Sequence, residues 1–279
     1  MRNLTAINYS SSIIRLFSCS MLFFLLPSFT GHDFTLIKEL TNVQGTKVFS
    51  DKFGCAYVAT SKNALTKLCA DSSRPKNYAM MRFGKITYAD VSNPLKILVF
   101  YKDFATIVIL DNTLSEQGLI DLRKTNILQP GAICLSLDNN IWVYDELEYR
   151  LKKLNTDNQV YRQSEDFTIL FPEGARPNFM LETENQLFVN DPEHGIRVFD
   201  VFGAYSKTIP IKGLERFQIV RNQLFYFQNG QLFSYHLKTF DTKPVALPST
   251  SQTHLLDVNI QEGTMVCLYE NALLLYAFK

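Results

Sequence analysis

A short β-hairpin pattern that recurs six times constrains the fold of this chain more than any other feature. In each copy an apolar strand is followed, about eleven residues later, by a second apolar strand, with a polar turn between them. The first strands align at Tyr57, Leu98, Trp142, Phe188, Phe225 and Val266, and the second strands at Leu68, Leu110, Leu154, Phe199, Tyr235 and Tyr276. Successive copies lie 41, 44, 46, 37 and 41 residues apart. A recurrence of roughly 40 residues built of short strands is typical of β-propeller blades. We therefore predict an all-β, six-bladed β-propeller.

The third copy of the pattern shows how one blade is built. An apolar stretch over 130–135 leads through an Asp-Asn-Asn turn to a second strand at 141–144, and a polar loop connects this strand to a third at 150–154. A further turn leads to an outer strand near 159–161. Short strands between clusters of Asn, Asp and Gly are what tight antiparallel hairpins require. Each blade is therefore predicted to be a four-stranded antiparallel sheet.

The last copy lacks an outer strand, because the chain ends directly after the third strand at 273–278. Residues 34–40 precede the first copy and belong to no blade of their own, and they are similar in sequence to the outer strand at 208–214. We expect residues 34–40 to pair with the last blade, because this pairing closes the ring and covers an exposed sheet edge.

Two stretches, 130–155 and 177–200, resemble NHL-type repeats. The strongest likeness lies in Trp142-Val143-Tyr144-Asp145 and in Phe188-Val189-Asn190-Asp191, where a strand ends in an aspartate. The resemblance implies a propeller fold and says little about activity. We expect the carboxylates of Asp145 and Asp191 to accept hydrogen bonds from backbone amides of their own loops.

The N-terminus has the order of features found in export signals. Arg2 and Arg15 precede an apolar run over 16–26, which is followed by Pro27 and small residues. The run is shorter than the ~20 residues that a membrane-spanning helix needs. We predict a signal peptide over residues 1–30, a single propeller domain over 31–279, and a location in the periplasm or elsewhere in the cell envelope. The alternative is an uncleaved leader, which would then be the chain's contact with the membrane.

Export bears on the cysteines, since an oxidising compartment permits disulfides. Cys19 would leave with the leader. A short hairpin turn over 61–63 places Cys55 opposite Cys69 on adjacent strands, so these two residues are candidates for a disulfide. The alternative is that Cys55, Cys69, Cys134 and Cys267 are all small buried residues with free thiols.

The loops between the second and third strands, together with the loops between blades, should gather on one face of a propeller. On this face we predict a binding surface with polar contacts at five residues: Asp103, Asp145, Glu146, Asp191 and His194. Such loop residues can also be merely solvated. A third interpretation is that they hold a metal or act as catalytic carboxylates.

The balance of 28 Lys and Arg against 27 Asp and Glu gives no attraction to a phosphate backbone, so nucleic-acid binding is not expected. The chain has four histidines, and only His194 falls in a loop on the candidate face. No catalytic residue, metal-ligating set or cofactor motif can be assigned. We therefore expect a non-catalytic exported scaffold or interaction module that binds partner proteins in the envelope. The alternative is a metal-assisted hydrolase or lyase with its site in the central channel.

Overall fold

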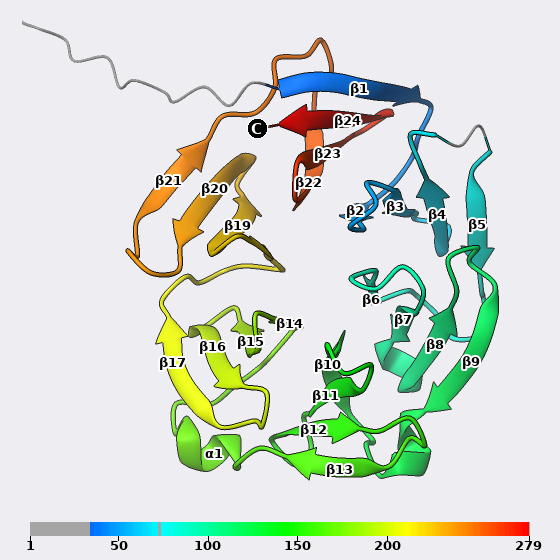
Figure 1. Ribbon diagram of the computed structural model, residues 1–279. Coiled ribbons are helices and arrows are strands. Elements are labelled where there is room, and N and C mark those ends of the chain that lie inside the picture. Colours follow the sequence, from blue (N-terminus) through cyan, green and yellow to red (C-terminus); the bar gives the residue numbers. More distant parts are fainter. Residues whose placement is uncertain (1–33, 72–73, 279) are drawn as a thin grey trace, which may run out of the picture. The chain divides into compact units, whose positions relative to one another are not determined.

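The computed structural model describes residues 34–71 and 74–278, and the predicted signal peptide lies outside these residues. The described strands form six antiparallel sheets of four strands each, arranged as the blades of a six-bladed β-propeller (Figure 1). The prediction of fold and blade number is confirmed. The two strands of the hairpin recognised in the sequence are the second and third strands of each blade. The residues that align on the first of these two strands, from Tyr57 to Val266, are buried in the packing between blades.

The blades follow one another along the chain. Blade 1 consists of β2 (Lys47–Ser50), β3 (Ala56–Ala59), β4 (Ala64–Leu68) and β5 (Lys76–Ala79). Blade 2 consists of β6 (Tyr88–Asp90), β7 (Ile97–Tyr101), β8 (Thr106–Leu110) and β9 (Glu116–Asp121), and blade 3 of β10 (Pro130–Leu135), β11 (Ile141–Asp145), β12 (Arg150–Leu154) and β13 (Val160–Gln163). Blade 4 consists of β14 (Phe179–Thr183), β15 (Gln186–Asp191), β16 (Gly195–Asp200) and β17 (Tyr205–Ile209), and blade 5 of β18 (Gln218–Val220), β19 (Gln223–Gln228), β20 (Gln231–His236) and β21 (Thr242–Val245).

Blade 6 is assembled from both ends of the described chain. Its inner strands are β22 (Leu255–Gln261), β23 (Thr264–Tyr269) and β24 (Ala272–Phe278), and its outer strand is β1 (Phe34–Thr41). The antiparallel register runs from the Phe34–Phe278 pair to the Thr41–Ala272 pair, with an irregularity between Leu36 and Lys38. The expected closure by residues 34–40 is confirmed, and the strand extends one residue further.

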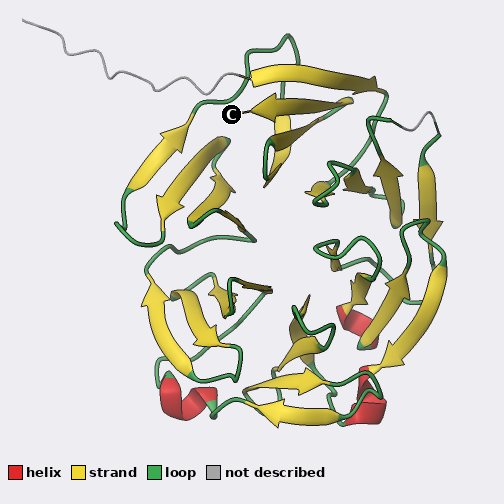
Figure 2. Ribbon diagram, viewed as in Figure 1, coloured by secondary structure: helices red, strands yellow, loops and turns green. Residues whose placement is uncertain are grey.

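The described residues form three short helical turns: η1 (Lys102–Phe104) in the β7–β8 loop of blade 2, η2 (Leu122–Thr125) between blades 2 and 3, and α1 (Phe167–Leu170) between blades 3 and 4 (Figure 2). In residues 34–71 and 74–278, no helix has the length and apolar character to span a bilayer.

The hydrophobic core lies between neighbouring blades. Successive residues of a strand point to opposite sides of the sheet. On β11, Trp142 therefore packs with Met180 of blade 4, whereas Val143 packs with Leu98 of blade 2. Each such fully buried aliphatic side chain contributes about 1.5–3 kcal/mol relative to an exposed one. The alternation explains why the central positions of the second strands are apolar on both sides of the sheet.

The inner strand of each blade has a free edge toward the channel, and side chains from other blades satisfy part of these edges. Asp90 of blade 2 accepts a hydrogen bond from the backbone N–H of Leu135 in blade 3 at 2.7 Å. At the junction of blades 6 and 1, the carboxylate of Asp257 accepts from Val48 N–H at 2.8 Å. Buried backbone donors need such partners, so these contacts lock the inner strands to one another.

A disulfide joins Cys55, just before β3, to Cys69, just after β4. The thiols of Cys134 and Cys267 are free and buried. The disulfide therefore fastens one end of the β3–β4 hairpin in blade 1.

Candidate functional site

The carboxylate of Asp145 lies inside the loop between β11 and β12. Asp145 is fully buried, and its Oδ1 accepts a hydrogen bond from Leu147 N–H at 3.0 Å. Its Oδ2 lies 2.7 Å from the ammonium of Lys152, which is also buried and reaches Glu148 at 2.8 Å. Asp145 therefore shapes its own loop and neutralises a buried cation, as a buried charge requires.

Asp191 has the equivalent place in blade 4. It is also fully buried, and its Oδ1 accepts from Glu193 N–H at 3.1 Å. Its Oδ2 lies 3.1 Å from the guanidinium of Arg197 and 3.0 Å from Nδ1 of His194. The expected hydrogen bonds to loop amides are thus present in both blades. Sequence reasoning missed the cations, because Lys152 and Arg197 stand on the third strand and not in the loop.

Two of the other predicted contacts reach the surface. Asp103 is exposed in η1, and Glu146 is partly exposed and forms a 2.7 Å ion pair with Lys102. This pair links the loops of blades 2 and 3. The five predicted residues therefore lie on three blades and do not form one cluster, and His194 meets only Asp191 among them.

The same loop face carries six exposed large apolar side chains that the sequence analysis did not single out. We call them the apolar arc: Met81, Phe104, Leu128, Leu147, Tyr149 and Ile169. Their exposed fractions range from 43% for Phe104 to 78% for Met81. They come from loops between the second and third strands and from loops between blades, over blades 1 to 4.

Contacts between these loops hold the arc together. The N–H of Glu146, next to Leu147, donates to the carbonyl of Gln129, next to Leu128, at 2.8 Å. The N–H of Phe167 in α1 donates to the carbonyl of Tyr149 at 2.8 Å. The ring of Phe104 lies 6.3 Å from that of Phe83, in the loop that carries Met81. The arc is therefore a surface built on connected loops.

Aromatic and basic side chains close the central channel across its axis. The ring of Tyr88 in blade 2 lies 5.5 Å from that of Phe49 in blade 1 and 5.3 Å from that of Phe179 in blade 4. Arg216, which precedes β18, places its guanidinium 4.7 Å from the ring of Phe49. It also donates to the carbonyl of Val48 at 2.7 Å and pairs with Asp257. Contacts between blades that are not neighbours show that these side chains form a plug.

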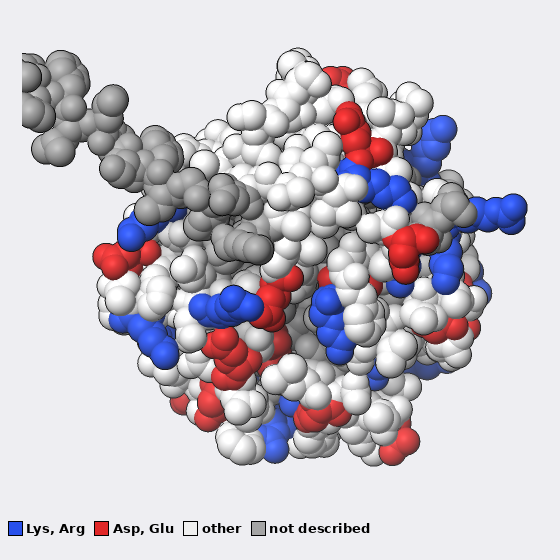
Figure 3. Space-filling model, turned by 45° about the horizontal axis from the view of Figure 1, so that its top comes forward, with Lys and Arg blue, Asp and Glu red and all other residues white. Residues whose placement is uncertain are grey.

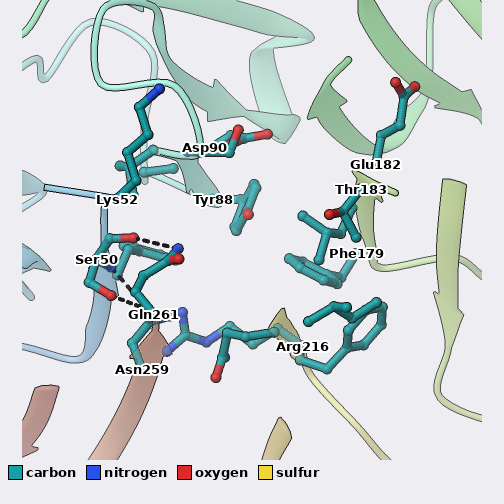
Figure 4. Close-up of a pocket in the computed structure, with 18 of the residues that line it drawn as sticks. Ser50, Lys52, Tyr88, Asp90, Phe179, Glu182, Thr183, Arg216, Asn259 and Gln261 are labelled. Carbon is teal, nitrogen blue, oxygen red and sulfur yellow. Dashed lines mark hydrogen bonds between the residues drawn. The ribbon is translucent and has the colours of Figure 1, made fainter. Parts of the chain in front are cut away.

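Below the plug, a pocket of about 230 Å³ opens toward the loops between first and second strands, on the face opposite the apolar arc. Figure 4 shows Ser50, Asn259 and Gln261 on one wall and Phe179 and Thr183 on the other. The remaining polar lining comes chiefly from Lys52, Asp90, Ser92 and Gln218. Sequence reasoning had no signal for this pocket, since its residues are scattered over all six blades.

The acidic side chains of the described residues are spread over the protein and are not gathered in one cluster. Among residues 34–71 and 74–278, no three His, Cys, Asp or Glu side chains lie together in a group suited to hold a metal ion. Figure 3 shows Lys and Arg interspersed with Asp and Glu over the visible face. This mixture agrees with the nearly balanced net charge of +1.

Comparison with solved structures gives the same fold. The chain is similar to virginiamycin B lyase from Staphylococcus aureus, with a TM-score of 0.62, 13% identity, and coverage of 88% of this chain and 99% of that one. It is also similar to a streptogramin B lyase (TM-score 0.60, 15% identity, 88% and 98% covered) and to BamB from Moraxella catarrhalis (TM-score 0.51, 10% identity, 88% and 98% covered).

These likenesses concern the fold alone, because the identities are too low to transfer residue roles. No family model and no curated protein sequence matches the chain. The NHL-type resemblance is therefore not confirmed, and the six-bladed propeller is the level at which the chain is classified.

Proposed function

We propose that the protein is a non-catalytic interaction module of the cell envelope, which binds a partner protein through the apolar arc. The observation that carries the proposal is the set of six exposed apolar side chains on one face. Single exposed apolar residues are ordinary, whereas a group of them on connected loops of one face favours an interaction surface. Its polar neighbours are Asp103 and Glu146, which would form the rim of the contact.

The buried ion pairs behind the arc favour this role. Asp145 with Lys152 and Asp191 with Arg197 hold the loops of blades 3 and 4 by contacts within the protein. Loops that are already ordered lose little conformational entropy when a partner binds. In this proposal Asp145, Asp191 and His194 contribute by positioning the loops, and the direct contacts come from the arc and its rim.

The test is co-purification from native envelope extract with two matched double variants. Leu147→Lys with Ile169→Lys places charges in the arc, and Leu95→Lys with Phe202→Lys places the same charges at equally exposed positions outside it. We expect the arc variant to lose stoichiometric partners that the natural chain and the control variant retain. An unchanged set of partners in the arc variant would overturn the proposal, provided that circular dichroism shows both variants folded.

A further inference from the structure

The channel pocket lies on the opposite face from the apolar arc, so it is a site separate from the proposed protein contact. Its inner end is closed by the plug of Tyr88, Phe49, Phe179 and Arg216. Its volume of about 230 Å³ is below the ~300–1,000 Å³ of pockets for drug-sized ligands. The pocket therefore has room for one small ring and not for an extended molecule.

The charged side chains that line the pocket select for neither sign of charge. Lys52 and Arg216 are cationic, and Asp90 and Glu182 are anionic, so their formal charges cancel. Arg216 is also paired with Asp257, and both carboxylates accept hydrogen bonds from blade 3. A cation or an anion in the pocket would meet attraction and repulsion together, whereas a neutral ligand avoids both. The charge balance of the wall therefore favours a neutral ligand.

Two amide side chains of β22 present opposite hydrogen-bonding groups to the pocket. Asn259 Oδ1 accepts from the backbone N–H of Ser50 at 3.1 Å, and Gln261 Nε2 donates to the backbone carbonyl of Ser50 at 3.2 Å. Because a backbone N–H only donates and a backbone carbonyl only accepts, Ser50 fixes the orientation of both amides. The Nδ2 donor of Asn259 and the Oε1 acceptor of Gln261 remain, and neither forms a hydrogen bond with another described residue.

This donor and this acceptor belong to one wall of the pocket. Asn259 and Gln261 are two residues apart on the same strand, so their side chains lie on the same face of the sheet. Figure 4 shows them next to each other beside Ser50, across the open space from Phe179 and Thr183. A ligand group that both donates and accepts can therefore engage the two amides together.

Tyr88 and Thr183 add neutral hydroxyl groups to the pocket. Phe49 and Phe179, which pack edge to face with Tyr88, are at most 7% exposed, whereas Tyr88 is partly exposed and so is the aromatic ring that a ligand can reach. Burial inside the channel raises the pKa of the Tyr88 hydroxyl well above its usual range, so this group stays neutral. The side-chain hydroxyls of Tyr88 and Thr183 form no hydrogen bond with another described residue.

We propose that the channel pocket binds one neutral sugar ring, either as a free monosaccharide or as the end of a glycan. Adjacent hydroxyl groups of a sugar donate and accept at once, which matches the acceptor of Gln261 beside the donor of Asn259. The weakly positive C–H groups of the ring pack favourably on an aromatic side chain, here Tyr88. An apolar contact combined with a few fixed polar groups is the usual composition of a small-ligand site.

The experiment is saturation-transfer difference NMR with isothermal titration calorimetry on the full chain. The neutral probes are glucose, galactose, mannose and N-acetylglucosamine, with the disaccharides cellobiose, maltose and chitobiose. Glucuronate and glucosamine add one charge to the same ring, and tetrahydropyran lacks the hydroxyl groups. We expect at least one neutral sugar to bind, its charged counterparts to bind more weakly, and tetrahydropyran not to bind.

The disaccharides distinguish the two sources of the ring. Equal affinity for a monosaccharide and its disaccharide would support a free sugar as the ligand, and binding of disaccharides alone would support the end of a glycan. Absence of binding by every neutral sugar would overturn the proposal. Tighter binding of a charged sugar, or of a dipeptide with both ends capped, would overturn it as well.

Two conservative variants assign the binding to the pocket. Tyr88→Phe removes one hydroxyl, and Asn259→Asp keeps the acceptor for Ser50 but replaces the Nδ2 donor. Each should weaken sugar binding about three- to tenfold, since one neutral hydrogen bond contributes about this factor in affinity.

Asn77→Asp is the matched control for Asn259→Asp. Asn77 is exposed on the outer strand β5, and its Oδ1 also accepts a hydrogen bond, from Thr66 Oγ1 at 2.7 Å. This variant should bind the sugar as the natural chain does, and thermal unfolding shows whether each variant is folded. Unchanged affinity in both folded pocket variants would refute the assignment to the channel pocket.

Discussion

Glu182 of blade 4 accepts a hydrogen bond at 2.6 Å from the indole Nε1 of Trp142 in blade 3. The same carboxylate accepts from Ser136 Oγ and from Leu137 N–H, so one side chain satisfies three donors of the neighbouring blade. Both Glu182 and Trp142 are buried. This relationship fastens two blades at the channel.

Replacing Glu182 by Ala should destabilise the protein by about 2–4 kcal/mol, because it leaves several buried donors without acceptors. Trp142 is the only tryptophan of the chain, so its fluorescence reports directly on this junction. We expect a shifted emission maximum together with a lower midpoint in urea. Glu262→Ala is the control, since Glu262 pairs with Arg221 at the surface and should change stability by less than about 1 kcal/mol. Equal midpoints for the two variants would contradict this account.

The disulfide of blade 1 should contribute about 2–4 kcal/mol, as expected for a bridge that closes a short loop. The double variant Cys55→Ser with Cys69→Ser should therefore unfold at a lower temperature than the natural chain. Scanning calorimetry with and without a reductant measures the difference. The reductant should lower the melting temperature of the natural chain only, and a natural chain insensitive to it would refute the bridge.

The free thiols of Cys134 and Cys267 should be unreactive in the folded protein. Burial raises the pKa of Cys267 to about 12 and that of Cys134 well above its usual range, and thiolate is the reactive form. Iodoacetamide at neutral pH should leave both residues unmodified until denaturant is added, as measured by peptide mapping. Rapid labelling of either residue in the native state would show that its blade opens.

Two glycines separate the effect of a backbone angle from that of a steric clash. Gly195 has a φ of +109°, and an added Cβ would lie 2.5 Å from the carbonyl oxygen of Ile209. Gly230 also has a positive φ, +78°, but an added Cβ would meet nothing within 4 Å. Gly230→Ala should cost about 1 kcal/mol, and Gly195→Ala should cost at least about 2 kcal/mol more. Similar unfolding free energies for the two variants would contradict the clash at Ile209.

Asp90 should give the stability a pH dependence. Burial raises the pKa of its carboxyl group, against the hydrogen bonds from Leu135 and Ser92 that lower it. The folded state then binds a proton more readily than the unfolded state, so this group's contribution to stability falls as the pH rises from the ordinary aspartate pKa of about 4 through the raised value. Asp90→Asn lacks this dependence. Urea unfolding between mildly acidic and neutral pH should show the natural chain gaining stability relative to the variant on acidification, and the opposite trend would refute the prediction.

The architecture was predictable because its signal is local and repeated. Each hairpin shows its own strands and turn, and the unassigned strand at 34–40 together with the missing outer strand of the last blade indicated how the ring closes. The exposure of the loop residues was less predictable than the architecture. The burial of Asp145 depends on Lys152, which stands on the next strand, and a loop position alone does not reveal this cation.

The side chains that close the channel could not be predicted at all from local patterns. The plug unites Tyr88 with Phe179 and Arg216 with Phe49, pairs that come from blades that are not neighbours. No periodicity links such residues, because they meet only when the whole ring is in place. The apolar arc was missed for a related reason, since its members are single apolar residues in loops that look polar.

The pairing of β1 with β24 also determines when the ring can close relative to synthesis of the chain. The partner of β1 is β24, at the other end of the described chain, so the ring cannot lock until both strands have been made. Contacts this far apart in sequence form late, because they carry the entropy of the largest possible loop. A chain that entered a translocation pore N-terminus first would therefore arrive with its ring open. It would complete its fold in the compartment that it enters.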